Sequence, residues 1–177
     1  MPLPPIPVFP NPTLPLEVDI ACGKGDFVLA MARQFPDRNF LGSDLQKSCM
    51  DELTAAILQE GLQNCLAVQR PAGQLVSDLP DACADKVHFS MPEHIGPQNV
   101  FNDDLFAGIR RILKPGGEFL FVTDDYPYVV MVTEVASRLG GVEKQEWTDH
   151  DRPKTYWETE LARRGRKIYR RKFLKLN

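Results

Sequence analysis

Short apolar segments alternate with segments of helical periodicity along this chain from residue 16 to its end. The first apolar run is followed by Phe27, Met31 and Phe35, which recur every four residues as one face of a helix does. The same alternation predicts strands at residues 16–21, 39–43, 64–69, 86–90, 118–123, 142–147 and 167–174. Helical connections join parallel strands, so the pattern predicts an α/β fold: a mostly parallel sheet with helices on both faces.

The first 15 residues differ in composition from the rest. They contain seven prolines, and proline fixes φ and lacks an amide donor, which excludes a helix or a central strand. We therefore expect residues 1–15 to form an extended arm that either wraps the domain or extends away from it. Residues 16–177 have the length of a single domain with one core.

Several classes of protein are excluded by composition. No apolar run approaches the roughly 18 residues that a membrane-spanning helix needs, and the N-terminus lacks the basic-then-apolar layout of a signal peptide. We expect a cytoplasmic protein with no membrane association, either a monomer or a homodimer. The cysteines form no C-x-x-C pair, so we expect free thiols and no bound metal. They are Cys22, Cys49, Cys65 and Cys83.

Charge is distributed unevenly along the chain. The net charge is −3 at pH 7, yet eight Lys and Arg residues lie between Arg163 and Lys175, and no Asp or Glu follows Glu160. The rest of the chain carries 13 basic and 24 acidic residues. The basic block is either a surface that binds a polyanion or a solvated edge that balances the acidic body. A strand over residues 167–174 would divide its charges between two faces, with some at the edge of the sheet.

A glycine-rich turn follows the first predicted strand and reads D-I-A-C-G-K-G-D-F over residues 19–27. Gly23 and Gly25 let the backbone turn tightly and approach a ligand closely, because no Cβ intervenes. The second predicted strand ends at Asp44, 19 residues after Gly25, where a carboxylate can accept hydrogen bonds from both ribose hydroxyls of a nucleoside. The combination favours a nucleoside cofactor over a strand turn with an incidental aspartate.

The spacing within this turn selects among nucleoside cofactors. The dinucleotide fingerprint requires a small residue where this chain has Val28, and the phosphate-binding loop pattern is absent. An acid two residues before a small residue, followed by x-G-x-G, is instead typical of S-adenosylmethionine-dependent methyltransferases. Asp19, Ala21, Gly23 and Gly25 fill that layout. Asp19 would hold the ammonium group of the cofactor directly or through water, or else it caps the amides of the turn.

Six short motifs extend this pattern over nearly the whole chain, from about Phe9 to Phe173. They are D-I-A-C-G-K-G-D-F at 19–27, N-F-L-G-S-D at 39–44, L-K-P-G-G at 113–117, T-D at 123–124, T-Y-W-E at 155–158 and G-R-K-I-Y at 165–169. In this combination the chain resembles the bacterial tRNA (guanine-N7-)-methyltransferases. The resemblance implies a Rossmann-like class I methyltransferase fold and methyl transfer from S-adenosylmethionine to a guanine N7 in tRNA.

The resemblance also implies roles for individual residues. The residues matched to the cofactor site are Asp19, Ala21, Gly23, Gly25 and Asp44. Asp124, Thr155 and Glu158 would bind the target guanosine or shape its pocket, with Asp124 as the catalytic residue. The Glu158 carboxylate would accept hydrogen bonds from the Watson–Crick edge of a guanine removed from its stack. Without the resemblance, the T-x-x-E spacing favours a capping box at a helix start, and Asp124 is a candidate cap of the next helix.

Two segments depart from the family pattern. In the loop after the fourth strand, the family's aspartate and lysine fall on Met91 and Ile95, and the family's basic run is absent. After the third strand, Arg-Pro at 70–71 stands where the family has an acid near the adenine. Guanine N7 has no proton to lose, so its methylation needs alignment and charge stabilisation rather than a general base. Glu93 or His94 is a candidate substitute, although a His94 that merely packs is the simpler interpretation.

Three hypotheses about function follow. The first is a tRNA guanine-N7 methyltransferase with a diverged catalytic loop, favoured by the T-Y-W-E segment. The second is a methyltransferase of the same fold that acts on a small molecule or another RNA, favoured by the acidic body and the altered loop. The third is a non-catalytic relative that binds cofactor or RNA, favoured by Met91 and Pro71.

Overall fold

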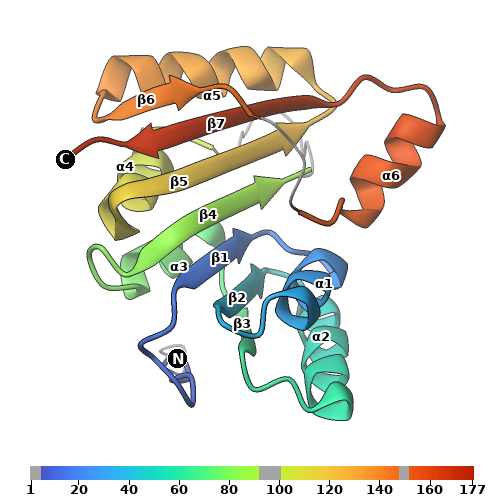
Figure 1. Ribbon diagram of the computed structural model, residues 1–177. Helices are drawn as coiled ribbons and strands as arrows, with labels where there is room; N and C mark the ends of the chain where they lie inside the picture. Colours follow the sequence, from blue (N-terminus) through green and yellow to red (C-terminus); the bar gives the residue numbers. More distant parts are fainter. Residues whose placement is uncertain (1–4, 92–100, 148–151) are drawn as a thin grey trace.

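A seven-stranded sheet forms the centre of the protein (Figure 1). The computed structural model describes residues 5–91, 101–147 and 152–177. The strand order is β3-β2-β1-β4-β5-β7-β6. β1 to β5 pair in parallel, and β7 lies antiparallel between β5 and β6, so the prediction of a mostly parallel α/β sheet is confirmed. The strands are Leu16–Ile20 (β1), Asn39–Asp44 (β2), Cys65–Gln69 (β3), Ala84–Ser90 (β4), Leu113–Thr123 (β5), Val142–Gln145 (β6) and Tyr169–Lys175 (β7).

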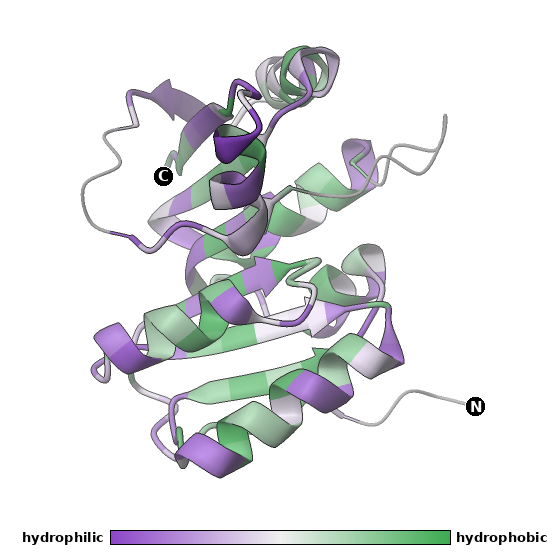
Figure 2. Cartoon of the chain, turned by 90° about the vertical axis from the view of Figure 1, so that its right-hand side faces the viewer, coloured by the Kyte–Doolittle hydropathy of each residue, from purple (hydrophilic) through white to green (hydrophobic). Residues whose placement is uncertain are grey.

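Helices cover both faces of the sheet in the described part of the chain. α1 and α2 pack on one face, and α3, α4 and α5 pack on the other. α6 lies at the end of the sheet toward which the arrowheads of β1, β4 and β5 point (Figure 1). The flanking helices alternate between green and purple in Figure 2, as amphipathic helices do when one face packs on a sheet. The helices are Asp26–Gln34 (α1), Lys47–Glu60 (α2), Ala72–Asp78 (α3), Asp103–Ile112 (α4), Tyr126–Leu139 (α5) and Tyr156–Arg163 (α6).

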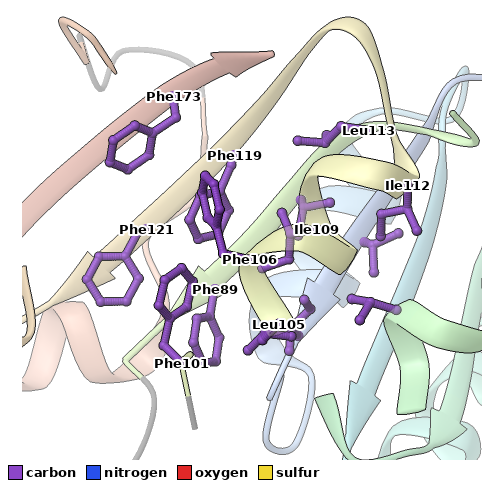
Figure 3. Close-up of a cluster of buried hydrophobic side chains, with 14 of the residues drawn as sticks. Phe89, Phe101, Leu105, Phe106, Ile109, Ile112, Leu113, Phe119, Phe121 and Phe173 are labelled. Atoms are coloured by element: carbon purple, nitrogen blue, oxygen red, sulfur yellow. The ribbon is translucent and has the colours of Figure 1, made fainter. Parts of the chain in front are cut away.

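The face of the sheet beneath α3, α4 and α5 is apolar. Successive strand residues point to opposite faces, and Phe89 of β4, Phe119 and Phe121 of β5 and Phe173 of β7 all enter one buried cluster (Figure 3). Phe101 stacks on Phe119 within it, with ring centroids 5.8 Å apart. This cluster fixes which face every residue of β4, β5 and β7 occupies.

The opposite face is polar where it lies over β4, β5 and β7. Lys172 of β7 pairs with Glu118 of β5 at 2.6 Å, and His88 of β4 lies 2.7 Å from Glu17 of β1. Burial would raise the pKa of Glu17, but the hydrogen bond and charge of His88, with other basic neighbours, lower it to about 2. These side chains line a cavity of about 330 Å³. The two faces of one sheet thus have opposite chemistry.

The β5 strand is longer than predicted. The sequence predicts a turn at residues 114–117 followed by a strand, whereas β5 already includes this segment. The pairing with β4 jumps from Ala84 opposite Leu113 to Lys86 opposite Glu118. The extra residues therefore bulge from a continuous strand, which is how a strand accommodates a turn-forming Pro-Gly-Gly sequence.

Two other features correct the sequence analysis. α3 is not predicted, because a seven-residue helix with only Leu75 and Val76 buried carries no helical period. β7 was expected to place some charges at the edge of the sheet, but it is an interior strand and β6 forms that edge. Asn102 caps α4, since its Oδ1 accepts a hydrogen bond from the Leu105 amide at 2.9 Å.

The described part of the proline-rich arm, residues 5–15, contains neither helix nor strand and leads directly into β1. Ile6 and Phe9 pack against the main apolar cluster. The Asn39 side chain donates a hydrogen bond to the Asn11 carbonyl at 2.8 Å. This part of the arm therefore lies against the domain and does not extend away from it.

Candidate functional site

The glycine-rich turn leaves β1 in a left-handed backbone. Ala21, Gly23 and Gly25 have φ values of 56°, 57° and 78°. A Cβ on Gly25 would lie 2.5 Å from Leu53 Cδ1, so this glycine is required by the packing of the turn against α2. A Cβ on Gly23 would meet nothing within 4 Å. The two glycines therefore differ: Gly25 closes the turn, and Gly23 leaves open space above it.

Asp44 ties the end of β2 to this turn. Its Oδ2 accepts a hydrogen bond from the Gly23 amide at 2.9 Å, and its Oδ1 accepts one from the Gln46 amide at 2.9 Å. The parallel pairing of β1 with β2 brings the two segments together, since Ile20 lies opposite Ser43. The sequence predicts Asp44 at the mouth of the site. In the structure its carboxylate also caps an amide of the glycine-rich turn, which is the alternative role that the sequence analysis gives to Asp19.

Asp19 is buried at the end of β1 with an unsatisfied oxygen. Its side chain is 4% exposed, and its Oδ1 has no hydrogen-bond partner among the described residues. Burial raises the pKa of Asp19 to about 8, with nearby Asp44 and Glu158 adding to the rise and Arg152 opposing it. A buried carboxyl oxygen without a donor is a position that a ligand's donor can fill. The residues present therefore fit S-adenosylmethionine, whose ammonium group supplies such donors.

The T-Y-W-E segment forms the N-terminus of α6 as a capping box. The Thr155 hydroxyl accepts a hydrogen bond from the Glu158 amide at 3.0 Å, and Glu158 Oε2 accepts one from the Thr155 amide at 2.9 Å. Glu158 is 1% exposed. Arg152 donates to both of its oxygens, at 2.8 and 3.0 Å, and Arg170 donates to Oε1 at 3.1 Å. Burial would raise the pKa of Glu158, but these arginines and the Thr155 amide lower it.

Arg152 joins the α6 cap to the glycine-rich turn, and the sequence analysis missed it. Its guanidinium lies 5.3 Å from the ring centroid of Phe27, in the first turn of α1, and 5.0 Å from that of Trp147. It also acts on the pKa of Asp19. No local motif marks this arginine: its six-residue spacing to Glu158 matches no recognised pattern, and Phe27 is far away in the sequence.

Asp124 follows the last residue of β5 and forms an ion pair with Arg166 at 2.9 Å. Its side chain is 17% exposed. The expectation that Asp124 caps α5 is wrong by one residue: Asp125 is the cap, and its Oδ1 accepts a hydrogen bond from the Tyr128 amide. Asp124 is thereby left at the carboxyl edge of the sheet, in contact with the segment that connects α6 to β7.

The segments that depart from the family pattern lie at the same edge. Arg70 is buried and pairs at 2.9 Å with Asp78, the last residue of α3, so its guanidinium is engaged within the fold and stabilises the end of that helix. Met91 follows β4 with a φ of 52°, and its amide donates to the Val122 carbonyl at 2.7 Å. Glu93, His94 and Ile95 lie outside the described residues.

The basic block at the end of the chain is largely paired with acids. Because five of the eight are paired with acids, the block is not one continuous unpaired cationic surface. Lys175 donates to the Leu113 carbonyl at 2.6 Å. The acid pairs are Arg163 and Arg164 with Glu160, Arg166 with Asp124, Arg170 with Glu158 and Lys172 with Glu118.

Within residues 5–91, 101–147 and 152–177, no three His, Cys, Asp or Glu side chains are grouped so that they could hold a metal ion. Among the helices of these same ranges, none is both long and apolar enough to span a membrane.

The chain is similar over most of its length to known tRNA methyltransferases. A protein-family model described as "Putative methyltransferase" matches residues 13–173. The tRNA (guanine-N(7)-)-methyltransferase of Rubrobacter xylanophilus is 30% identical to this chain over 166 residues, which cover 88% of this chain and 74% of that protein. A protein of the same name from Streptococcus pneumoniae is 28% identical over 171 residues, with 88% and 79% covered.

Solved structures of methyltransferases share the fold. The aminoglycoside resistance methyltransferase NpmB1 superposes with a TM-score of 0.72 at 25% identity, covering 92% of this chain and 87% of that one. The phosphoethanolamine N-methyltransferase 2 of Haemonchus contortus, solved in complex with S-adenosyl-L-methionine, gives a TM-score of 0.63 at 18% identity, with 95% and 50% covered. The fold is therefore the Rossmann-like methyltransferase fold.

Proposed function

The chain belongs to the tRNA (guanine-N(7)-)-methyltransferase family, and from that premise we propose that it methylates N7 of a guanosine in tRNA. S-adenosylmethionine is the cofactor. When bound, it supplies a methyl group activated by the positive charge of a sulfonium. A cytoplasmic location, where tRNA is modified, is part of the same proposal.

The observation that carries the proposal is the position of Asp19 relative to Glu158. Asp19 stands at the end of β1 with a buried oxygen that has no described partner, as a cofactor carboxylate should. Glu158 belongs to the segment that resembles the guanosine-binding motif, and its charge acts on the pKa of Asp19. Arg152 contacts Glu158 directly and faces Phe27 beside the glycine-rich turn. The residues proposed for the cofactor and those proposed for the substrate thus lie in one cluster at one edge of the sheet, which supports the proposal.

Each predicted site residue has a proposed role in this cluster. Asp19 holds the ammonium group, and Gly23 leaves room for the cofactor above the turn. Asp44 accepts hydrogen bonds from the ribose while its oxygens also order the turn. Ala21 and Gly25 set the turn's left-handed backbone, which keeps its upper side open.

On the substrate side, Thr155 and Glu158 shape the pocket by fixing the start of α6. Every oxygen of Glu158 already accepts hydrogen bonds from this chain, so shaping the pocket suits it better than direct contact with the base. Asp124 is partly exposed at this edge, next to the α6–β7 connection, and it is the proposed catalytic residue. Since N7 carries a lone pair and no proton, Asp124 would orient the guanine and stabilise charge rather than remove a proton.

A methyltransferase that acts on a small molecule or another RNA is the second candidate. It is favoured by Met91, which occupies the place of the family's loop aspartate. The internal pairing of Arg170 and Lys172 also favours it, because it removes two cations from the phosphate contacts that dominate affinity for nucleic acid.

The test is methyl transfer from labelled S-adenosylmethionine to bulk unmodified tRNA, followed by nucleoside analysis. We expect label in 7-methylguanosine for the wild-type protein. Asp124→Asn should lose most of that label, whereas Leu58→Ala, at an exposed position on α2, should retain it. Cofactor binding by calorimetry without label in tRNA would reject tRNA as substrate and favour the second candidate.

A further inference from the structure

Three aromatic side chains are exposed in the described structure, and all three stand in the first turn of a helix. Tyr126 begins α5 and is 53% exposed, while Tyr156 and Trp157 begin α6 and are 58% and 52% exposed. Aromatic side chains of this size normally bury most of their surface. Their exposure at the edge of the sheet that carries the candidate site marks a surface that contacts a partner.

The capping box determines that Tyr156 and Trp157 face solvent. Thr155 and Glu158 point inward, toward each other and toward Arg152. The two residues between them are consequently what the T-Y-W-E segment presents outward. Their rings contact each other at 5.2 Å with an angle of 74°, which holds both in defined orientations. The outer positions of the motif are structural, and the inner positions are available for recognition.

A second aromatic pair and a cluster of cations belong to the same region. Tyr126 contacts Tyr169 at 5.3 Å, and the Lys167 ammonium lies 5.1 Å from the Tyr169 ring centroid. Residues 163–167, from the last residue of α6 into the α6–β7 connection, carry four cations, which are opposed by Glu160 and Asp124. This stretch therefore keeps a net positive charge beside the exposed rings.

We propose that Tyr156 and Trp157, with the Tyr126–Tyr169 pair, stack against unpaired bases of the RNA substrate while the cations of residues 163–167 contact its phosphates. Exposed aromatic faces next to basic groups suit single-stranded nucleotides, because every base has a face that stacks and every linkage carries a negative charge. This inference rests on the proposed function, since it takes tRNA as the partner. It also assigns RNA binding to the α6–β7 connection rather than to β7, whose Arg170 and Lys172 are paired internally.

Binding of unmodified tRNA to the double variant Tyr156→Ala/Trp157→Ala tests the proposal. We expect its affinity to fall about tenfold or more, because stacking contributes substantially for each base. The dependence of affinity on salt should stay as in the wild type, since no charge is removed. Affinity for S-adenosylmethionine should also be unchanged, which shows that the fold is intact. Leu58→Ala, which removes an exposed apolar side chain from α2, is the matched control and should bind as the wild type.

Tryptophan fluorescence supplies a second, independent readout. The chain has two tryptophans, Trp147 and Trp157. Stacking of a base on Trp157 should quench its emission, and Trp157→Phe should abolish that quenching while it keeps most of the affinity. Wild-type affinity in the double variant, or quenching that persists in Trp157→Phe, would overturn the stacking surface while tRNA methylation still stands. A wild-type protein that neither binds nor methylates tRNA would overturn the proposed function together with this surface.

Discussion

Two carboxylates at the carboxyl edge of the sheet, Asp19 and Glu158, are equally hidden from solvent and yet have opposite surroundings. Glu158 is 1% exposed and receives hydrogen bonds from Arg152, Arg170 and the Thr155 amide. Asp19 is 4% exposed, and its Oδ1 has no partner in the described part of the chain. Their pKa values accordingly move apart: that of Glu158 is lowered and that of Asp19 is raised to about 8.

The contrast separates a structural carboxylate from one arranged for a ligand. A buried charge is stable only with partners, and Glu158 has them within this chain. At Asp19 the charge of Arg152 does not offset burial, so the protein alone favours its neutral form, and our proposal is that a cationic ligand ionises it. Similar burial therefore does not imply a similar role.

The largest expected effect comes from removing the Glu158 carboxylate. Glu158→Ala leaves Arg152 and Arg170 without their shared acceptor and opens the α6 cap, so the free energy of unfolding should fall by about 3–5 kcal/mol. Urea unfolding followed by circular dichroism measures it. Asp103→Asn is the matched control, because it breaks a two-bond pair with Arg138 that is exposed to solvent, and it should change stability little. If both substitutions changed the free energy of unfolding equally, the Glu158 carboxylate would not be a structural group, and the distinction between Glu158 and Asp19 would fail.

Substitution of Asp19 should instead leave the stability of the protein nearly unchanged and weaken cofactor binding. Asp19→Asn resembles the neutral acid in shape and charge, so the unfolding transition at pH 7 should stay close to that of the wild type. Cofactor affinity should fall roughly ten- to hundredfold, since a charged hydrogen-bond acceptor is lost. Calorimetric titration with S-adenosylmethionine and thermal unfolding of the same preparation measure both. Unchanged cofactor affinity would exclude Asp19 from the site.

The same comparison predicts a pH dependence of cofactor binding. The pKa of Asp19 is raised from 3.8 to about 8, so below pH 8 the free protein carries it protonated. An ammonium ligand favours the carboxylate, so binding should release a proton, and affinity should rise with pH by at most about tenfold per unit until it levels near pH 8. Titrations in buffers of different ionisation enthalpy detect the proton, and Asp19→Asn should abolish its release.

Stability should show the opposite trend from the same group. The unfolded chain ionises Asp19 near its ordinary pKa, whereas the folded chain keeps the proton up to about pH 8. The contribution of Asp19 is therefore fully present below pH 3.8 and is lost as pH rises toward 8. A cofactor affinity that does not depend on pH between 6 and 8 would show that the carboxyl is already ionised in the free protein.

The parts of this comparison differ in how far the sequence predicts them. The order of strands and helices, the glycine-rich turn and the capping spacing of Thr155 and Glu158 are local patterns, and each is visible within about ten residues. Arg152 is not predictable in this way, because its contact with the distant Phe27 forms only in the folded protein and its spacing to Glu158 matches no recognised pattern. The unsatisfied oxygen of Asp19 likewise depends on what surrounds it in space.

The basic end of the chain illustrates the same limit. A count of charges after Glu160 predicts one cationic block, but the partners of Lys172 and Arg166 are Glu118 and Asp124, on β5 and directly after it. Pairing across strands thus draws Arg170 and Lys172 into internal ion pairs, whereas the cations of residues 163–167 keep exposed side chains even where they are paired.

The smallest expected effect concerns the strained residue beside Asp19. Ala21 has a φ of 56°, where a Cβ is unfavourable, so Ala21→Gly should raise stability by up to about 1 kcal/mol, the relief of strain being partly offset by a more flexible unfolded chain. Ala82, with a φ of 49° in an exposed turn far from the site, offers the same relief through Ala82→Gly. If the rigid turn prepares the site around Asp19, only Ala21→Gly should weaken cofactor binding, by a few-fold. Equal cofactor affinities in the two variants would mean that the strain at Ala21 serves folding alone.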